Sequence, residues 1–146
     1  MHSQGIPETM QNEPKYMDVC LDIYDFLSQQ IENLVNSGMQ RKAIIVDPGI
    51  GFGKSLMHNL SLLRNISLFH GLGVPILIGV SKKKFVKTLA GLKENEDRMP
   101  GSISVALYAR SQGVQIFRVH NVKETVQAMK LWHSVHFNNV GDPDVS

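Results

Sequence analysis

The segment 44–55, with the sequence IIVDPGIGFGKS, combines a carboxylate, three glycines at alternate positions and a Gly-Lys-Ser ending. Such an ending is typical of loops that bind nucleotide phosphates, whose pattern is G-x-x-x-x-G-K-[ST]. In this sequence the first glycine of the pattern is replaced by Pro48, five positions before Gly53. Because proline lacks a backbone N–H, it cannot donate to a phosphate where the loop should begin. The residues therefore argue against a nucleotide-binding loop.

The carboxylate of this segment, Asp47, follows an apolar run and precedes glycines that let a flat ligand approach the backbone. A buried carboxylate needs a hydrogen-bonding partner, because its burial alone is costly. A planar heterocycle with an N–H and an amino group side by side can bind a carboxylate through two parallel hydrogen bonds. The alternative interpretation is that Asp47 caps the helix that follows the loop.

A lysine-rich segment, GVSKKK at 79–84, follows a second apolar run. Consecutive lysines at the start of a helix usually form a solvated face, and we expect this of Lys84 and Lys87. Lys83 differs in position, since its long stem can reach over the end of the strand and donate to a carbonyl oxygen or a ring nitrogen. Lys83 is therefore a candidate ligand-binding residue.

A third segment, FRVHN at 117–121, carries Arg118 and His120 two positions apart. Residues separated by two on a strand point to the same side. An arginine and a histidine placed together suit an anionic group such as a pyrophosphate. Either residue alone could be structural, so the prediction depends on the pair.

These segments are expected at the ends of strands in an alternation of strands and helices. Apolar periodicity and the positions of glycine and proline predict helices over 14–36, 56–70, 83–89, 101–112 and 122–135, and strands over 43–47, 75–81 and 114–121. The strands are continuous apolar runs, as expected for parallel strands buried on both faces. The predicted fold class is α/β with parallel βα repeats.

Two layouts fit this alternation, an open doubly wound sheet and a (β/α)8 barrel. Both bind ligands at the carboxyl ends of their strands, where this sequence has Asp47, Ser81 and His120. A complete barrel needs about 250 residues. The chain has 146 residues, so on length it corresponds to roughly half of one.

Composition restricts the classes of function. With 42% hydrophobic and 19% charged residues the chain is expected to form one globular unit. The net charge is +2 and the basic residues are scattered among acidic ones, which gives no reason to expect a nucleic-acid partner. No apolar run is long enough to span a membrane, and no signal peptide is recognisable at the start. The single cysteine, Cys20, fits a cytoplasmic protein without disulfides.

Several segments together resemble a known family. DPGIGFGK, GVSKKKFV and FRVHNVKETV resemble, in order and spacing, the three C-terminal signatures of the dihydropteroate synthase family. MHSQGIPETMQ, at the start, resembles the segment that ends the family's fifth strand, and DRMPGS at 97–102 is also similar to the family. The resemblance implies that residues 1–137 form the C-terminal half of a pterin-binding TIM-type (β/α)8 barrel, and we expect a frayed tail over 138–146.

The resemblance also implies a reaction. The family is a transferase in folate biosynthesis that condenses 6-hydroxymethyl-7,8-dihydropterin pyrophosphate with p-aminobenzoate, giving 7,8-dihydropteroate and pyrophosphate, and it is the target of sulfonamides. It uses Mg2+, whose expected ligand lies in the N-terminal half of the family pattern. That half has no counterpart in this chain, so no metal ligand is expected among its residues.

Matching the motifs residue by residue implies roles in pterin binding. Asp47 would bind the amino-pyrimidine edge of the pterin, and Gly51 would let the pterin approach. Lys83 would bond the pterin and lie against the aminobenzoate site, with Gly79 and Ser81 close by.

The same matching implies the catalytic residues. Arg118 would stack on the pterin face and, with His120, hold the leaving pyrophosphate, while Phe52 would line the aminobenzoate side. The expected catalytic set is therefore Lys83, Arg118 and His120. Electrostatic stabilisation of the departing anion would supply most of the acceleration.

Some residues depart from the family pattern. Lys82 stands where arginine is usual, Lys84 where a small hydroxyl residue is common, and Asn121 where aspartate commonly follows the histidine. None of these replaces a residue assigned to catalysis.

Two hypotheses from different classes follow from the missing half. The chain is either a dihydropteroate synthase, active when its barrel is complete, or a non-catalytic remnant that binds a pterin or only associates with itself. A half-barrel leaves open sheet edges, so we expect a homo-oligomer or a complementing N-terminal half as partner.

Overall fold

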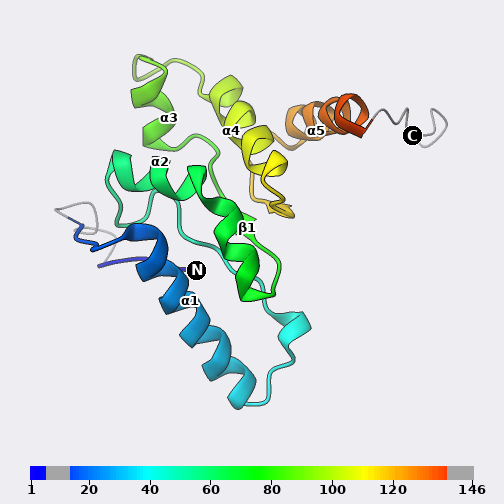
Figure 1. The fold of residues 1–146 in the computed structure, drawn as a ribbon. Helices are drawn as coiled ribbons and strands as arrows, with labels where there is room; N and C mark the ends of the chain where they lie inside the picture. The colour runs from blue at the N-terminus through cyan, green and yellow to red at the C-terminus, as the bar shows by residue number, and fades with distance from the viewer. Residues whose placement is uncertain (6–13, 138–146) are drawn as a thin grey trace.

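The computed structural model describes residues 1–5 and 14–137 (Figure 1). Five α-helices, two short 3-10 helices and two short strands follow one another in this part of the chain. In chain order they are α1 (Val19–Asn36), η1 (Arg41–Ala43), α2 (Leu56–Arg64), η2 (Ile66–Leu72), β1 (Leu77–Ile78), α3 (Lys84–Leu89), α4 (Met99–Ser111), β2 (Ile116–Phe117) and α5 (Val122–Phe137).

The extended segments lie side by side in chain order. β1 and β2 are parallel, with Leu77 opposite Ile116, and an isolated parallel bridge joins Val46 to Ile76. Beyond Val46, the backbone N–H of His2 donates to the carbonyl oxygen of Asp47 at 3.0 Å. The predicted α/β class with parallel strands is therefore confirmed.

The strands are shorter than predicted over 43–47, 75–81 and 114–121. Side chains take the place of backbone partners at both ends of the pairing. The N–H of Ile76 donates to the Gln115 side chain at 2.9 Å, and the N–H of His120 donates to the Ser81 hydroxyl at 3.3 Å. The first predicted strand is reduced to the bridge at Val46, and its first residue, Ala43, belongs to the 3-10 turn Arg41–Ala43.

One face of these extended segments is covered by helices and the other is partly open. Alternate residues pack into the core with α1, α2 and η2, namely Ile44, Val46, Ile76, Ile78 and Val80. Between them, Ile45 is 52% exposed, and Leu77 is only partly buried. The prediction of strands buried on both faces is therefore wrong for Ile45, which has no covering layer in the described part of the chain.

Helix α1 begins at Val19 rather than at the predicted residue 14. Its start is fixed by Asp18, whose carboxylate accepts the N–H groups of Cys20 and Leu21 at 2.8 and 3.1 Å. This is the expected action of an aspartate N-cap. The buried stripe of the helix consists of Val19, Cys20, Ile23, Leu27 and Ile31.

The helix predicted over 56–70 is two helices. Ser55 caps α2, since its hydroxyl accepts the N–H of His58 at 3.1 Å. At Asn65 the backbone leaves helical geometry, and the Asn65 amide donates to the carbonyl oxygen of Ser61 at 2.9 Å. Such a local side-chain bond competes with helix continuation. The chain then continues as the 3-10 helix η2.

The remaining boundaries differ by one or two residues from those predicted. α3 starts at Lys84 with Lys83 as its N-cap residue, and α4 starts at Met99 with a proline in its first turn. α5 extends to Phe137. The predicted tail over 138–146 lies outside the described residues.

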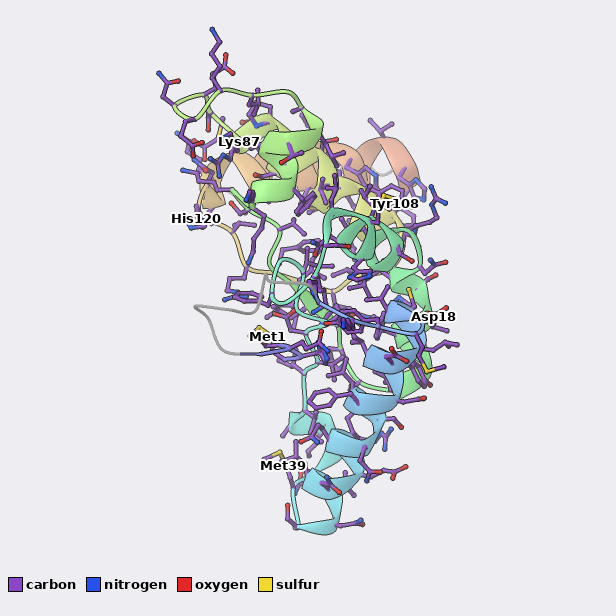
Figure 2. All side chains as sticks on the ribbon, turned by 90° about the vertical axis from the view of Figure 1, so that its left-hand side faces the viewer. Met1, Asp18, Met39, Lys87, Tyr108 and His120 are labelled. Atoms are coloured by element: carbon purple, nitrogen blue, oxygen red, sulfur yellow. The ribbon has the colours of Figure 1, made fainter. Side chains whose placement is uncertain are left out.

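The first and last helices lie at opposite ends of the molecule. Both views place α1 far from α5, which packs on α4 (Figures 1 and 2). Along α5 only Thr125 is fully buried. None of the helices in the part of the chain that the structure describes is long and apolar enough to cross a membrane.

Candidate functional site

The carboxyl ends of the three extended segments meet at one place. The Arg118 guanidinium, at the end of β2, lies 3.4 Å from the carboxylate of Asp47, at the end of the first segment. The Ser81 hydroxyl, beyond β1, lies 3.0 Å from Nδ1 of His120. The imidazole of His120 is exposed, at the left edge of Figure 2. The contact between Asp47 and Arg118 thus joins residues that are 71 positions apart in the chain.

Asp47 is buried and accepts two hydrogen bonds. Its Oδ1 accepts the N–H of Gly49 at 2.7 Å, and its Oδ2 accepts from Arg118. The helix after the loop is capped by Ser55 instead, so the interpretation of Asp47 as a helix cap is wrong. Asp47 therefore faces the cationic groups at the strand ends.

Lys83 extends over the glycine-rich loop, which comprises residues 48–55. Its Nζ lies 3.7 Å from the centre of the Phe52 ring, which is a cation–π contact. Burial, and secondarily the charge of Arg118, lower the pKa of the Lys83 amine, while Asp47 opposes the shift. The lysine and the phenylalanine from two different loops thus form one wall of the site.

Two glycines provide room for these long side chains. A Cβ at Gly51 would lie 3.0 Å from Cδ of Lys83, and the φ of Gly51, 81°, also favours glycine. A Cβ at Gly79 would lie 2.9 Å from Nη2 of Arg118. The predicted site glycines therefore allow Lys83 and Arg118 to lie close against the backbone.

Sequence reasoning missed two buried titratable residues, His2 and Lys54, of which Lys54 belongs to the glycine-rich loop. Lys54 is 3% exposed, donates to the carbonyl oxygen of Phe52 at 2.9 Å and lies 3.1 Å from Nδ1 of His2. Burial lowers the pKa of Lys54 to about 8, opposed by Asp47 and helped by Lys83. Burial and the neighbouring Lys54 lower the pKa of His2 to about 4. The sequence signal that contains Lys54 is the Gly-Lys-Ser ending, which is typical of phosphate loops and does not indicate a buried lysine.

Two further residues hold the glycine-rich loop and were also missed. Asn59 is buried, and its side-chain oxygen accepts the N–H of Gly51 at 2.7 Å. The hydroxyl of Tyr16 donates to the carbonyl oxygen of Gly53 at 2.8 Å. Burial raises the pKa of Tyr16 to about 12. No pattern in the sequence distinguishes either residue from an ordinary helix or loop residue.

The residues that depart from the family pattern surround this site. Lys84 is exposed, as predicted for a solvated face, and Lys82 is exposed too. Lys87, for which the same prediction was made, is only partly exposed and pairs with the carboxylate of Glu94. Oδ1 of Asn121 is buried without a hydrogen-bond partner in the described structure.

Within residues 1–5 and 14–137 there is no cluster of three or more His, Cys, Asp or Glu side chains suited to a metal ion.

A cavity of about 320 Å³ lies beside Lys83. It is lined by residues of the glycine-rich loop and of the first turns of α2 and α3, including Gly51, Lys54, Ser55, Leu56, Lys83 and Phe85. A larger groove of about 970 Å³ lies between β2 and α5, away from this loop. The smaller cavity adjoins Gly51 and Lys83 of the predicted site, and the larger groove adjoins Arg118.

Comparison with known proteins identifies the class. The family model described as "Pterin binding enzyme" matches residues 1–120. The chain therefore belongs to the pterin-binding enzyme family.

Curated relatives confirm the resemblance to dihydropteroate synthase. The dihydropteroate synthase of Escherichia coli strain K12 is 43% identical over 131 residues, which cover 90% of this chain and 46% of the relative. That of Neisseria meningitidis serogroup B strain MC58 is 41% identical over 141 residues, covering 94% of this chain and 50% of the relative. The chain thus spans about half the length of the curated relatives that it matches.

Solved structures agree. Dihydropteroate synthase of Yersinia pestis, in a sulfonamide drug complex, matches with a TM-score of 0.88 and 40% identity over 94% of this chain and 50% of that one. The Thermus thermophilus enzyme in complex with 4-aminobenzoate matches with a TM-score of 0.84 and 35% identity over 90% of this chain and 53% of that one. The same enzyme has also been solved in complex with 6HMPPP.

Proposed function

We propose that this chain forms the C-terminal half of a (β/α)8 barrel and carries the substrate-binding face of a dihydropteroate synthase. In the complete barrel it condenses 6-hydroxymethyl-7,8-dihydropterin pyrophosphate with p-aminobenzoate, in the cytoplasm. The observation that carries the proposal is the contact between Asp47 and Arg118 beside the stacked pair of Lys83 and Phe52. These contacts involve residues from all three of the segments that carry the sequence motifs.

Asp47 supplies the recognition of the pterin. One oxygen of its carboxylate accepts the N–H of Gly49, and the other oxygen faces the partly exposed guanidinium of Arg118. A pterin presents an N–H and an amino group on one edge, which match a carboxylate in two hydrogen bonds. The planar guanidinium of Arg118, whose side chain is 58% exposed, can then stack on the ring.

Cationic groups supply the stabilisation of the leaving group. In the reaction the bond from the pterin methylene carbon to the pyrophosphate oxygen breaks, and a bond from the same carbon to the aminobenzoate nitrogen forms. Arg118, His120 and Lys83 place positive charge or N–H donors near the departing anion, and such charge stabilisation lowers the activation barrier most effectively when it is preorganised. The arylamine attacks as a neutral nucleophile, and its nitrogen then loses one proton, which the released pyrophosphate or water can accept, so no general base is assigned.

The aminobenzoate is proposed to occupy the side of the site formed by Phe52 and Lys83. The cavity of about 320 Å³ beside Lys83 combines apolar residues such as Leu56 and Phe85 with three lysines that can receive a carboxylate, Lys54, Lys83 and Lys84. The Thermus thermophilus enzyme, in complex with 4-aminobenzoate, supports this substrate for the family.

Mg2+ is proposed as cofactor of the complete barrel, with its protein ligand outside this chain. The described residues include no group of three or more His, Cys, Asp or Glu side chains that could hold a metal ion. When bound, the ion would neutralise charge on the pyrophosphate.

The other half of the barrel is proposed to cover the open face. Ile45 is 52% exposed on this face. A separate groove of about 970 Å³, whose lining includes Phe117, Val122 and Met129, lies between β2 and α5. Exposed apolar surface of this extent is typical of an interface. We assign it to the missing half because the relatives are about twice as long as this chain; pairing of two copies of this chain is the other outcome that a mass measurement would reveal.

The second candidate function is a non-catalytic pterin-binding remnant. The observation that favours it is the length of the chain, about half that of its relatives, although the pterin-side residues are present. Binding of the pterin without turnover in a completed barrel would select this function.

Calorimetric titration with the dihydropterin pyrophosphate tests the proposal. We expect the Lys83→Ala chain to bind it about 10- to 100-fold more weakly, as loss of a charge-assisted hydrogen bond implies. Lys42→Ala, at an exposed lysine in η1, is the matched control and should bind like the unchanged chain. Equal binding by both variants would contradict the assignment of Lys83.

A further inference from the structure

The segment that carries Lys83 contains an unfavourable backbone conformation. In the described parts of the chain, Lys82 is the one non-glycine residue with a positive φ, 57°. L-residues other than glycine seldom adopt this left-handed conformation, because Cβ crowds the following carbonyl group. Surrounding contacts must therefore hold Lys82 in it.

The contacts come from the start of α4, in the DRMPGS segment (97–102). The N–H of Lys82 donates to the Ser102 hydroxyl at 2.9 Å, and the carbonyl oxygen of Lys82 accepts from Arg98 Nη1 at 3.1 Å. The Ser102 hydroxyl itself donates to the carbonyl oxygen of Arg98 at 2.6 Å. Both peptide groups of Lys82 are thus bonded to one turn of α4.

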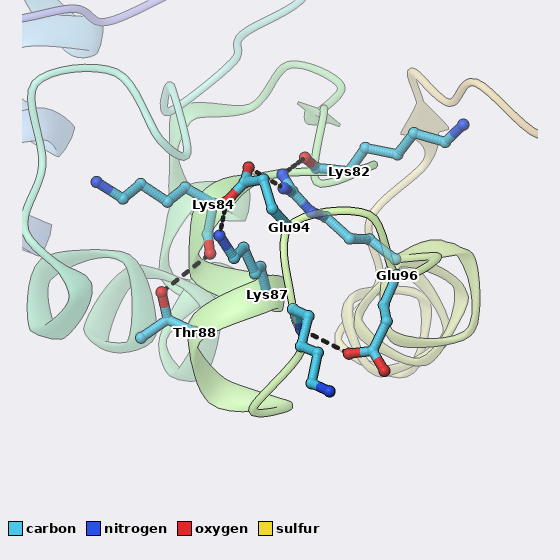
Figure 3. Close-up of polar contacts among 8 residues, drawn as sticks. Lys82, Lys84, Lys87, Thr88, Glu94 and Glu96 are labelled. Carbon is cyan, nitrogen blue, oxygen red and sulfur yellow. Dashed lines mark hydrogen bonds and ion pairs between the residues drawn. The ribbon is translucent and has the colours of Figure 1, made fainter.

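The two residues that make these bonds are themselves fixed. Ser102 is buried, and Arg98 also pairs with Glu94 at 3.2 Å, which in turn contacts Lys87 (Figure 3). α4 also lies close to α3, since a Cβ at Gly101 would be 2.6 Å from Cγ1 of Val86. The bonds to Lys82 therefore come from the first turn of α4, in which Ser102 is buried.

The left-handed residue determines where the neighbouring lysines point. Figure 3 shows the side chains of Lys82 and Lys84 extending to opposite sides of the segment. Lys83, between them, turns inward over the Phe52 ring. On the other side of Lys82, the Ser81 hydroxyl is bonded to His120. The chain thus changes direction sharply between two residues of the site.

We propose that Arg98 and Ser102 are positioning residues, which place Lys83 in the site by holding Lys82 in its left-handed conformation. The consequence for pterin binding rests on the proposed function, whereas the effect on the Lys83 side chain does not. This role links the DRMPGS segment to the site, because the segment acts on Lys83 through the backbone of Lys82.

The experiment uses the full chain and three variants. Ser102→Ala removes the acceptor for the Lys82 N–H, and Ser104→Ala makes the same change at an exposed serine of α4. The double variant Ser102→Ala/Lys82→Gly adds a residue that adopts the left-handed conformation without strain. Side-chain NMR of Lys83, assigned by Lys83→Arg, measures the amine pKa and the ring-current shift from Phe52. Calorimetry measures the affinity for the dihydropterin pyrophosphate.

We expect Ser102→Ala to raise the Lys83 pKa toward its ordinary value, to remove the ring-current shift, and to weaken pterin binding about tenfold. Ser104→Ala should leave all three unchanged, and the double variant should restore them. A merely stabilising Ser102 would move the unfolding midpoint without moving the Lys83 signals. The proposal is overturned by unchanged Lys83 signals in folded Ser102→Ala, or by a double variant that does not recover them. If the unchanged chain binds no pterin, the proposed function fails, and the Lys83 signals still decide the positioning role.

Discussion

At the scale of single residues, the site is a balance of several cations around one buried carboxylate. Asp47 bonds Arg118 and acts on the pKa values of both Lys54 and Lys83, raising each against the effect of burial. The charge of Lys83 in turn disfavours the charged form of Lys54. Groups with perturbed pKa values that gather in this way are typical of functional sites.

This balance predicts the effect of removing the carboxylate. Asp47→Asn should lower the pKa of Lys54 from about 8 to a smaller value, because the partner that favours the charged amine is gone. NMR titration of the lysine side chains measures the shift. Asp25→Asn, at an exposed aspartate of α1, is the matched control. A Lys54 pKa that stays in place would show that Asp47 does not act on it.

His2 predicts a dependence of stability on pH. Its pKa falls from 6.5 to about 4 on folding, so between these values the unfolded chain binds more protons than the folded chain. The free energy of unfolding should therefore decrease as the pH is lowered from about 6.5, with the loss from His2 complete below about 4. Denaturant titrations across this range measure it.

The control for this prediction is a histidine outside the site. His2→Asn should reduce the slope of stability against pH, whereas His133→Asn, at an exposed position of α5, should keep it. Equal slopes for both variants would exclude His2 as the titrating group.

Much of the candidate site could be predicted at this scale, and the reason is chemical. Asp47, Lys83, Arg118 and His120 are charged or polar residues directly beyond apolar runs, where parallel strands present their ligand-binding groups. Lys54 could not be placed in the same way, because its surroundings include His2, 52 positions away in the chain. Contacts of this range leave no local pattern.

At the scale of elements, the order of helices and strands was predictable but several boundaries were not. Apolar periodicity, continuous apolar runs and the positions of glycine and proline locate the elements. The break at Asn65 depends on one side-chain hydrogen bond to Ser61. The exposure of Ile45 was not predictable, because an apolar run does not indicate whether both faces of a strand are covered.

In the first extended segment Val46 is buried and its neighbour Ile45 is exposed. Substitutions at the two positions should therefore change the free energy of unfolding by different amounts. Val46→Thr places a hydroxyl in the core and should lower the free energy of unfolding by about 1–3 kcal/mol. Ile45→Thr, at the exposed neighbour, should change it by less than about 0.5 kcal/mol. Urea denaturation of both variants measures the difference. Comparable losses at the two positions would mean that Ile45 is covered in solution.

At the scale of the whole molecule, the chain is an α/β unit with one face of its strands packed and the other partly open. α1 and α5 lie at opposite ends, and α5 has one fully buried residue, Thr125. The length of the relatives, about twice that of this chain, accounts for the open face if a second half covers it. The site lies at the strand ends that border this face, so the proposed catalysis requires that the proposed barrel be complete.

The most direct test is the release of pyrophosphate from the dihydropterin pyrophosphate in the presence of Mg2+, with and without p-aminobenzoate. It should be made on the chain alone and on the chain combined with the other half of a relative such as the Escherichia coli enzyme, with the mass of each species measured in solution. We expect aminobenzoate-dependent release of pyrophosphate from the combined barrel and its loss in Lys83→Ala. A folded, combined barrel that binds the pterin but releases no pyrophosphate would contradict the assignment of catalysis and leave a pterin-binding remnant.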